Sequence, residues 1–296
     1  MKQTSLFILF TYILFTACAG RQTEEKLVSV TIEPQRYFAE KIAGDKFVIH
    51  TVVPAGQNPE IYDPTPQQMV KVSKSEAYLR VGHLGLEEVW VSKLLENNSH
   101  MKVFDLSEGF SLIENEEEYE HEHQSGEVYN HAHHGVDPHI WSSVAGAKKM
   151  AWNVLYAFID LDKDNTSYYW ENYNRLMSEI EETEQQIARL LESLDNRTFI
   201  IYHPALTYFS HEYGLTQLSI EMEGKEPSPA QLKQLIDTAR TSGAKVVFIQ
   251  QEFDQKNAEL IAKETNCKLV VINPLAYDWK KEMIHIAQAL ADGETY

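Results

Sequence analysis

The sequence predicts an α/β protein of two similar lobes, each with a parallel sheet covered by helices. Short apolar segments rich in Val, Ile, Phe and Tyr alternate with amphipathic segments of helical periodicity, and the second half of the chain repeats the scheme of the first. A long helical segment lies between the halves. Because strands that alternate with helices form parallel sheets buried on both faces, we expect two α/β lobes with one long helix between them.

Each lobe is expected to contain four strands. In the first lobe we place strands at Leu27–Ile32, Phe47–Val53, Ala77–Val81 and Lys102–Phe104, and helices near Gln35–Ile42, Pro66–Lys74 and Leu86–Glu96. In the second lobe we place strands at Thr198–Tyr202, Leu218–Ile220, Ala244–Ile249 and Lys268–Ile272, and helices near Ala205–Tyr213, Pro229–Ser242, Gln255–Glu264 and Trp279–Ala289.

The segment from Thr166 to Asp195 contains no Gly or Pro and carries apolar side chains at three- and four-residue steps. A helix of about 28 residues would be ~42 Å long, enough to run along both lobes. We therefore expect an N-terminal lobe at 27–164, a linking helix at 165–195 and a C-terminal lobe at 196–296. The alternative is a coiled-coil dimer helix, but the stripe is broken at Thr183 and begins with tyrosines.

The composition excludes several classes of protein. With 43% hydrophobic residues among 296, the chain is neither disordered nor a collagen or disulfide scaffold. It has 26 basic and 44 acidic side chains, a net charge of −18, so it lacks the basic surface that would neutralise a nucleic-acid backbone. The acidic balance is compatible with a cationic ligand.

The first residues have the pattern of an export signal. The apolar run Leu6–Ala17 is shorter than the ~20 residues of a membrane span but fits a signal-peptide core, so we expect 1–17 to be removed. The run leads into Cys18, which resembles a bacterial lipoprotein processing site, although Phe15 stands where leucine is usual. We expect a periplasmic or cell-surface lipoprotein anchored at Cys18, with 18–26 as its tether; a plain signal peptide is the alternative.

A charged segment, Ile113–Val136, contains seven carboxylates and few apolar residues, so we expect a mobile surface loop. Neutral imidazoles suit Zn, Cu and Ni, and interleaved carboxylates raise the local cation concentration. We expect weak auxiliary metal sites here; a solvated acidic loop with incidental histidines is the alternative. Five of the chain's 12 histidines lie in it: His121, His123, His131, His133 and His134.

Polar residues also follow the predicted strands, where ligands bind in open α/β sheets. Glu60 lies in the loop after the strand that ends at Val53, and His203 directly follows a strand. Asp278 comes just past the strand that ends at Ile272, and His139 begins the ordered segment after the charged loop. These residues can converge on a cleft between the lobes. Taken singly, His139 and Asp278 are also compatible with helix-capping roles.

Five segments resemble the signatures of the metal-binding solute proteins of bacterial zinc/manganese ABC importers. They are Gly56–Pro66 (GQNPEIYDPTP), Asp137–Trp141 (DPHIW), Tyr202–Ala205 (YHPA), Glu223–Pro229 (EGKEPSP) and Asn273–Leu275 (NPL). The resemblance covers essentially the whole mature chain. It implies two (β/α)4 lobes joined by a single long rigid helix, with a transition metal in the cleft between them. By position, it also implies Glu60, His139 and His203 as metal ligands, with Asp278 as the fourth.

One position departs from the family. The family usually has histidine where this chain has Glu60, but a carboxylate oxygen still binds Zn²⁺ at ~2.0–2.2 Å. The resulting set of two imidazoles and two carboxylates matches the composition used by manganese-type members, whereas His203 and the histidine-rich loop resemble the zinc branch. We therefore expect Zn²⁺ ahead of Mn²⁺, with iron behind. The alternative is that Glu60 faces water, which leaves a three-ligand site completed by Asp278 or solvent.

Histidine ligands need hydrogen-bond partners that fix their tautomers. Asp137, Glu221 and Glu252 are candidates that the sequence does not rank.

We expect a monomer that captures Zn²⁺ and delivers it to a membrane permease driven by a separate ATPase. A zinc hydrolase is the enzyme alternative, but the sequence has no His-Glu-x-x-His helix or nucleophile elbow, and a fourth ligand would leave no activated water. We therefore expect no enzyme activity. A surface adhesin is the third possibility, since the anchor would place the chain at the cell exterior.

Overall fold

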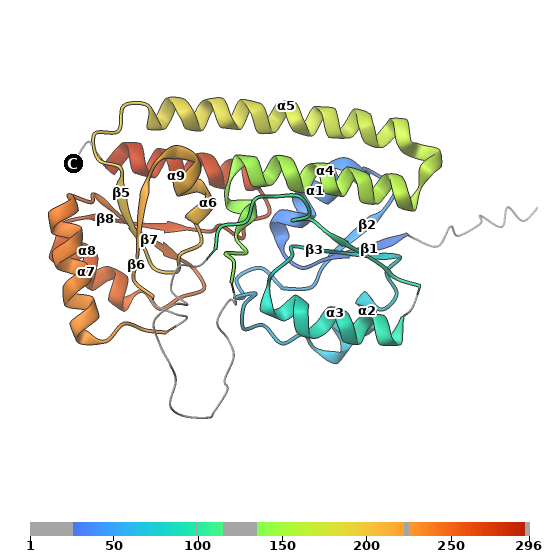
Figure 1. Ribbon diagram of the computed structural model, residues 1–296, viewed down its shortest axis with the longest axis horizontal. Coiled ribbons are helices and arrows are strands. Elements are labelled where there is room, and N and C mark those ends of the chain that lie inside the picture. Colours follow the sequence, from blue (N-terminus) through green and yellow to red (C-terminus); the bar gives the residue numbers. More distant parts are fainter. Residues whose placement is uncertain (1–25, 99, 115–134, 222–224, 294–296) are drawn as a thin grey trace, which may run out of the picture.

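The computed structural model describes residues 26–98, 100–114, 135–221 and 225–293. They form two parallel four-stranded sheets with helices (Figure 1). The first sheet has the order β2-β1-β3-β4 and the second the order β6-β5-β7-β8. These strands are β1 (Leu27–Val30), β2 (Val48–Thr51), β3 (Ala77–Arg80), β4 (Lys102–Asp105), β5 (Thr198–Ile201), β6 (Thr216–Ser219), β7 (Val246–Gln250) and β8 (Lys268–Ile272). The prediction of two similar parallel α/β lobes is confirmed.

Both sheets have the same strand order, and in each the second strand lies on one side of the first while the third and fourth lie on the other. Each sheet therefore has one topological switch point, where the chain crosses from one side of the first strand to the other. In the second sheet, β6 lies on one side of β5, and the chain then crosses to β7 on the other side. Loops that leave β5 and β7 therefore diverge at their carboxyl ends and open a crevice, which is where ligands bind in this architecture. β7 is buried along its whole length, as expected for a strand with neighbours on both sides.

The helices that follow the strands begin at recognisable signals. Thr65 and Ser228 each cap a helix whose first residue is proline, and each accepts a hydrogen bond from the backbone three residues on. α6 begins two residues later than predicted, because the Ala205 amide donates to His203 O in a tight turn. The helices flanking the sheets are α1 (Glu33–Ala43), α2 (Pro66–Val72), α3 (Gly85–Asn97), α6 (Thr207–Tyr213), α7 (Pro229–Ser242), α8 (Lys256–Thr265) and α9 (Trp279–Gly293).

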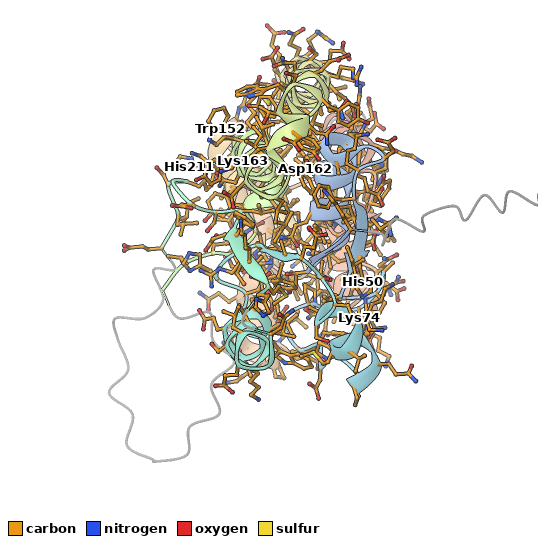
Figure 2. The ribbon with its side chains drawn as sticks, turned by 90° about the vertical axis from the view of Figure 1, so that its right-hand side faces the viewer. His50, Lys74, Trp152, Asp162, Lys163 and His211 are labelled. Carbon is orange, nitrogen blue, oxygen red and sulfur yellow. The ribbon has the colours of Figure 1, made fainter. Side chains whose placement is uncertain are left out.

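One long helix, α4 (Val144–Leu161), was not predicted from the sequence. Nine of its 18 residues are buried, so its apolar face is broad and does not give the narrow stripe that periodicity reveals. A short 3₁₀ turn, η2 (Ile140–Ser142), precedes it, and a second one, η3 (Lys163–Asn165), follows it. Figure 2 shows Asp162 and Lys163 at this end of α4, and Lys26 Nζ lies 3.3 Å from Asp162 Oδ2.

The predicted linking helix is α5 (Thr166–Leu191), which lies across α4 and α9 (Figure 1). The apolar stripe of α5 is buried in the hydrophobic core of this chain. The stripe is therefore explained without the coiled-coil partner helix that was the alternative. Thr183, where the stripe breaks, is also buried, and its hydroxyl donates to Glu179 O at 2.7 Å. A polar residue is therefore tolerated on the buried face because the helix backbone satisfies it.

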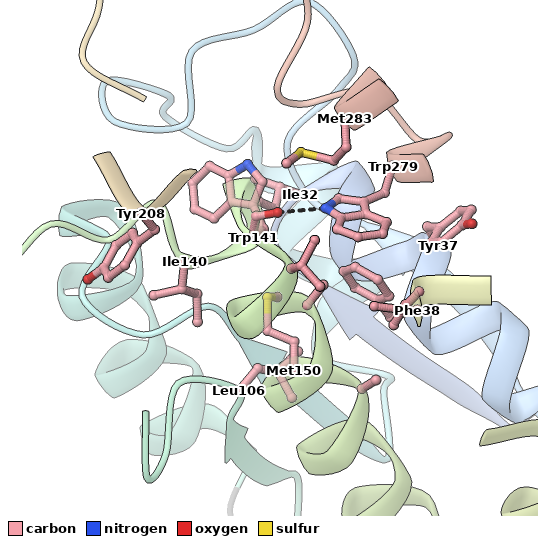
Figure 3. Packing of buried hydrophobic residues seen from close by; sticks show 14 of the residues in the cluster. Ile32, Tyr37, Phe38, Leu106, Ile140, Trp141, Met150, Tyr208, Trp279 and Met283 are labelled. Carbon is pink, nitrogen blue, oxygen red and sulfur yellow. Dashed lines mark hydrogen bonds between the residues drawn. The ribbon is translucent and has the colours of Figure 1, made fainter. Parts of the chain in front are cut away.

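A single hydrophobic cluster extends from one lobe into the other. It contains strand residues of both sheets, such as Val30 and Phe248, and the packed side chains of Trp141 and Trp279 (Figure 3). Trp279 Nε1 donates to Trp141 O at 2.7 Å, and Trp141 Nε1 donates to Pro274 O at 3.0 Å. These two bonds tie the segment before α4 to the first residue of α9 and to the loop before it, so the two lobes share one core.

The predicted signal peptide, Cys18 and all five loop histidines lie outside the described residues. At the base of the loop, Glu114 pairs with Val136 in an antiparallel bridge, and the Asp137 amide donates to Ile113 O at 2.9 Å. Where the structure describes the chain, none of its helices has both the length and the apolar character of a membrane span.

Trp279→Ala should lower the free energy of unfolding by ~3–5 kcal/mol, because it removes a large side chain that is only 2% exposed and leaves a cavity between the lobes. Urea denaturation would measure the loss. Trp152→Ala is the matched control, since Trp152 is 47% exposed and should cost much less. Equal losses would contradict a core shared by the lobes.

Candidate metal site

Three side chains from distant parts of the sequence converge between the lobes. His203 Nε2 lies 3.2 Å from His139 Nε2 and 3.0 Å from Glu60 Oε1, and His139 Nε2 lies 3.5 Å from the same oxygen. Within the described part of the chain, these residues form a group whose donor atoms all lie within 4.8 Å of one another. The structure thus brings together three of the four ligands implied by the sequence resemblance.

The spacing of these atoms fits a metal ion. Ligands bound to zinc at ~2.0–2.1 Å in a tetrahedron are separated from one another by about 3.3 Å. The three separations here are 3.0, 3.2 and 3.5 Å. One ion placed beside the triangle could therefore contact all three atoms without rearrangement of the backbone.

Each ligand is positioned by the turn that precedes or contains it. Glu60 lies in the loop after β2, where its amide donates to Asn58 Oδ1 at 2.9 Å. His139 follows Pro138 and precedes η2, and its amide donates to Asp137 Oδ1 at 2.8 Å. His203 follows β5 in the turn that delays α6.

Carboxylates orient both imidazoles. His139 Nδ1 lies 2.8 Å from Asp137 Oδ1, and His203 Nδ1 lies 2.9 Å from Glu221 Oε2. A proton on each Nδ1 satisfies its carboxylate and leaves the lone pair of Nε2 for a metal. Of the three carboxylates that the sequence did not rank, Asp137 and Glu221 fill this role and Glu252 does not.

The backbone of His203 is held by a residue that sequence reasoning missed. Gln250, at the end of β7, donates from Nε2 to His203 O at 2.6 Å and accepts from His203 N at 3.3 Å. The ring of Phe253 stacks on the imidazole at 5.2 Å between centroids. A polar residue that closes an otherwise apolar strand was the available signal for Gln250; Phe253 gave none.

Burial disfavours a positive charge on either imidazole, but the neighbouring carboxylates outweigh it. The charge of Asp137 and its hydrogen bond raise the pKa of His139. Glu60 and Glu221 together raise the pKa of His203 to about 10. The surroundings therefore favour a cation at this point, either a proton or a metal ion.

The cavity beside these ligands is small. It measures about 30 Å³ and is lined by residues of both lobes, with Trp141 and Pro274 among them. This is room for a single water-sized species, far below the ~300–1,000 Å³ of pockets for organic ligands. The site is thus built for an ion.

Asp278 does not join the group. It is exposed, does not line the cavity, and its Oδ1 accepts from the Lys281 amide at 3.1 Å at the start of α9. The structure therefore places Asp278 in the helix-capping role, because the backbone amides of the first turn of α9 supply its partner. Glu60, in contrast, turns inward, with a side chain that is 15% exposed.

Fold and site define a class of two-lobed α/β proteins in which side chains suited to bind a transition metal converge from both lobes. Comparison with known proteins gives the particular family. The model for the periplasmic component A of zinc-uptake complexes, ZnuA, matches residues 28–293, and the chain belongs to this family.

The relatives include zinc and manganese proteins. The high-affinity zinc uptake system protein ZnuA of Bacillus subtilis is 28% identical over 287 residues, covering 93% of this chain and 89% of that protein. The zinc-binding lipoprotein AdcA of Streptococcus pneumoniae is 26% identical over 282 residues, covering 93% of this chain, which spans 56% of AdcA. The manganese ABC transporter substrate-binding lipoprotein PsaA of Streptococcus pneumoniae is 25% identical over 285 residues, covering 90% of this chain and 87% of PsaA.

Solved structures agree with the fold. A crystal structure of ZnuA superposes with a TM-score of 0.82 at 36% identity, covering 91% of this chain and 99% of that one. A zinc-bound deletion mutant of ZnuA gives a TM-score of 0.81 at 36% identity, with coverages of 91% and 98%.

Glu221→Ala should weaken metal binding about 10–100-fold, because His203 loses the carboxylate that fixes its tautomer. Competition with a coloured chelator would measure the affinity. Glu179→Ala removes a partly buried carboxylate on α5 that does not line the cavity, and it should leave the affinity unchanged. If both variants bind alike, Glu221 does not position His203.

Proposed function

We propose that the mature chain binds Zn²⁺ in the cavity between its lobes and presents it to the membrane permease of an ABC importer, driven by a separate ATPase. The observation that carries this proposal is the triangle of Glu60, His139 and His203, whose 3.0–3.5 Å spacing suits one four-coordinate ion. Membership of the zinc-uptake family supports the same conclusion.

Zinc fits the donor set best. Imidazole nitrogen suits zinc, whereas manganese is best served by carboxylate, carbonyl and water oxygens. Two of the three converging donors are imidazole nitrogens, each presented by a carboxylate partner. Manganese is the second candidate, and the specific observation in its favour is the carboxylate of Glu60.

The chain's own residues account for capture and release of the ion. Asp137 and Glu221 hold the two Nδ1 protons, so both Nε2 atoms face the ion. Because the lobes share one core, release requires movement of the ligand loops and a modest rotation of the lobes rather than wide opening. The cavity of about 30 Å³ has no room for an organic substrate, which supports binding rather than catalysis.

We further propose export by the signal at 1–17 and attachment of a monomer to the membrane through Cys18. Relatives named as lipoproteins support the anchor. The tether 18–26 would then be short, and the lobes at 27–164 and 196–296 would stay near the membrane that holds the permease. The loop histidines would serve as weak auxiliary sites that raise the local zinc concentration.

Calorimetry on the mature protein should show one tightly bound equivalent of Zn²⁺, and His203→Ala should lose it because the ion keeps two of three described ligands. Deletion of residues 115–134 is the control: it should remove weak additional binding and leave the tight site. No tight binding by the unaltered protein would overturn the proposed function. Loss of the tight site on deletion would mean that the loop supplies a primary ligand.

Zinc binding should release protons and strengthen as pH rises. Burial lowers the pKa of His203, but Glu60 and Glu221 raise it to about 10, so the metal-free imidazole is protonated near neutral pH and zinc must displace that proton. One released proton changes the affinity about tenfold per pH unit below that pKa. Binding enthalpies in buffers of different ionisation enthalpy would count the protons, and enthalpies independent of the buffer would contradict the prediction.

A further inference from the structure

Glu252 is a carboxylate beside the metal cavity that the site described so far does not use. It lies in the loop that leaves β7 and lines the cavity together with Glu60, His139 and His203. Its Oε1 is buried and has no hydrogen-bond partner within the described residues. A buried carboxylate oxygen without a partner is costly, so its presence beside a metal cavity calls for a cation.

The other polar side chains that line the cavity are already engaged. Asn58 Oδ1 accepts from the Glu60 amide, and both ends of the Gln250 amide are bonded to the backbone of His203. Glu252 is therefore the lining carboxylate, beyond Glu60, that offers an oxygen to an ion.

The position of Glu252 in the fold agrees with this role. His203 lies in the loop after β5, and Glu252 lies in the loop after β7. These two strands are hydrogen-bonded neighbours at the topological switch point of the second sheet. Glu252 also stands between Gln250, which holds the His203 backbone, and Phe253, which stacks on its ring. The loop that holds His203 in place thus also carries a carboxylate beside the cavity.

From this arrangement we propose that Glu252 supplies the fourth ligand to the bound ion, in the place that the resemblance gives to Asp278. The inference rests on the proposed function, since it needs a metal in this cavity. Glu252 is not within the group whose donor atoms lie within 4.8 Å of one another. Its side chain therefore rotates onto the ion when the ion binds, and it gives a set of two imidazoles and two carboxylates.

Glu252→Gln tests the ligand directly. We expect at least a tenfold loss of Zn²⁺ affinity in chelator competition and a changed visible absorption spectrum of the Co²⁺-loaded protein, because the d–d bands report the ligands of the ion. Asp254→Asn is the matched control: it removes a negative charge from the same loop at an exposed position that does not line the cavity. It should leave both readouts as they are in the unaltered protein.

Glu252→Asp keeps the charge but withdraws the carboxylate by one methylene, and we expect it to weaken zinc binding as well. If the glutamine variant does not fold, this variant tests whether the Glu252 carboxylate binds the ion. Unaltered affinity and Co²⁺ spectrum in the Glu252 variants would overturn the proposal. A loss of affinity with an unchanged spectrum, or a spectral change in Asp278→Asn instead, would also overturn it. Absence of tight zinc binding in the unaltered protein would instead be a failure of the proposed function.

Discussion

The hydrogen bond from Trp279 to the Trp141 carbonyl, inside a core that contains both side chains, is the constraint on which the metal site depends. Trp141 lies two residues after His139, and its indole and carbonyl are bonded to the C-terminal lobe at Pro274 and Trp279. The same hydrophobic cluster contains strand residues of both sheets. A fixed distance between the lobes is needed because imidazoles from two separate elements must approach within 3.2 Å. A flexible hinge would spread that distance and weaken the site.

The three converging donor atoms repel one another electrostatically, and the surrounding carboxylates favour a cation that relieves this repulsion. The lone pairs of two Nε2 atoms and one carboxylate oxygen repel one another unless a cation lies among them. Asp137 and Glu221 are each less than 10% exposed, so they act on the imidazoles with little screening by water. Although burial lowers the pKa of both histidines, the charge of Asp137 raises that of His139, and Glu60 together with Glu221 raises that of His203. The arrangement that favours a proton therefore also favours a divalent metal.

The sequence predicted the sheets well because each strand and helix carries its own local pattern of burial and capping. It missed α4, whose burial on a broad face gives no clear stripe, and it did not fix the residues around His203. Gln250 and Phe253 act on His203 from 47 and 50 positions along the chain, and no local pattern predicts such a contact. The position of Asp278 after a strand suggested a ligand. In the structure, however, its carboxylate accepts a hydrogen bond from the Lys281 amide in the first turn of α9.

The shared core also bears on how an ion leaves. Since Trp141, Trp279 and the long helix α5 hold the lobes together, the free energy needed to separate them is large. The ligands, however, lie on loops, and Glu60 is held by a local turn within its own lobe. Movement of that loop would remove one of the three converging donors while the two histidines stay in place. A partner that draws the Glu60 loop aside could therefore weaken the site without separating the lobes, and a modest rotation of the lobes would then complete the release.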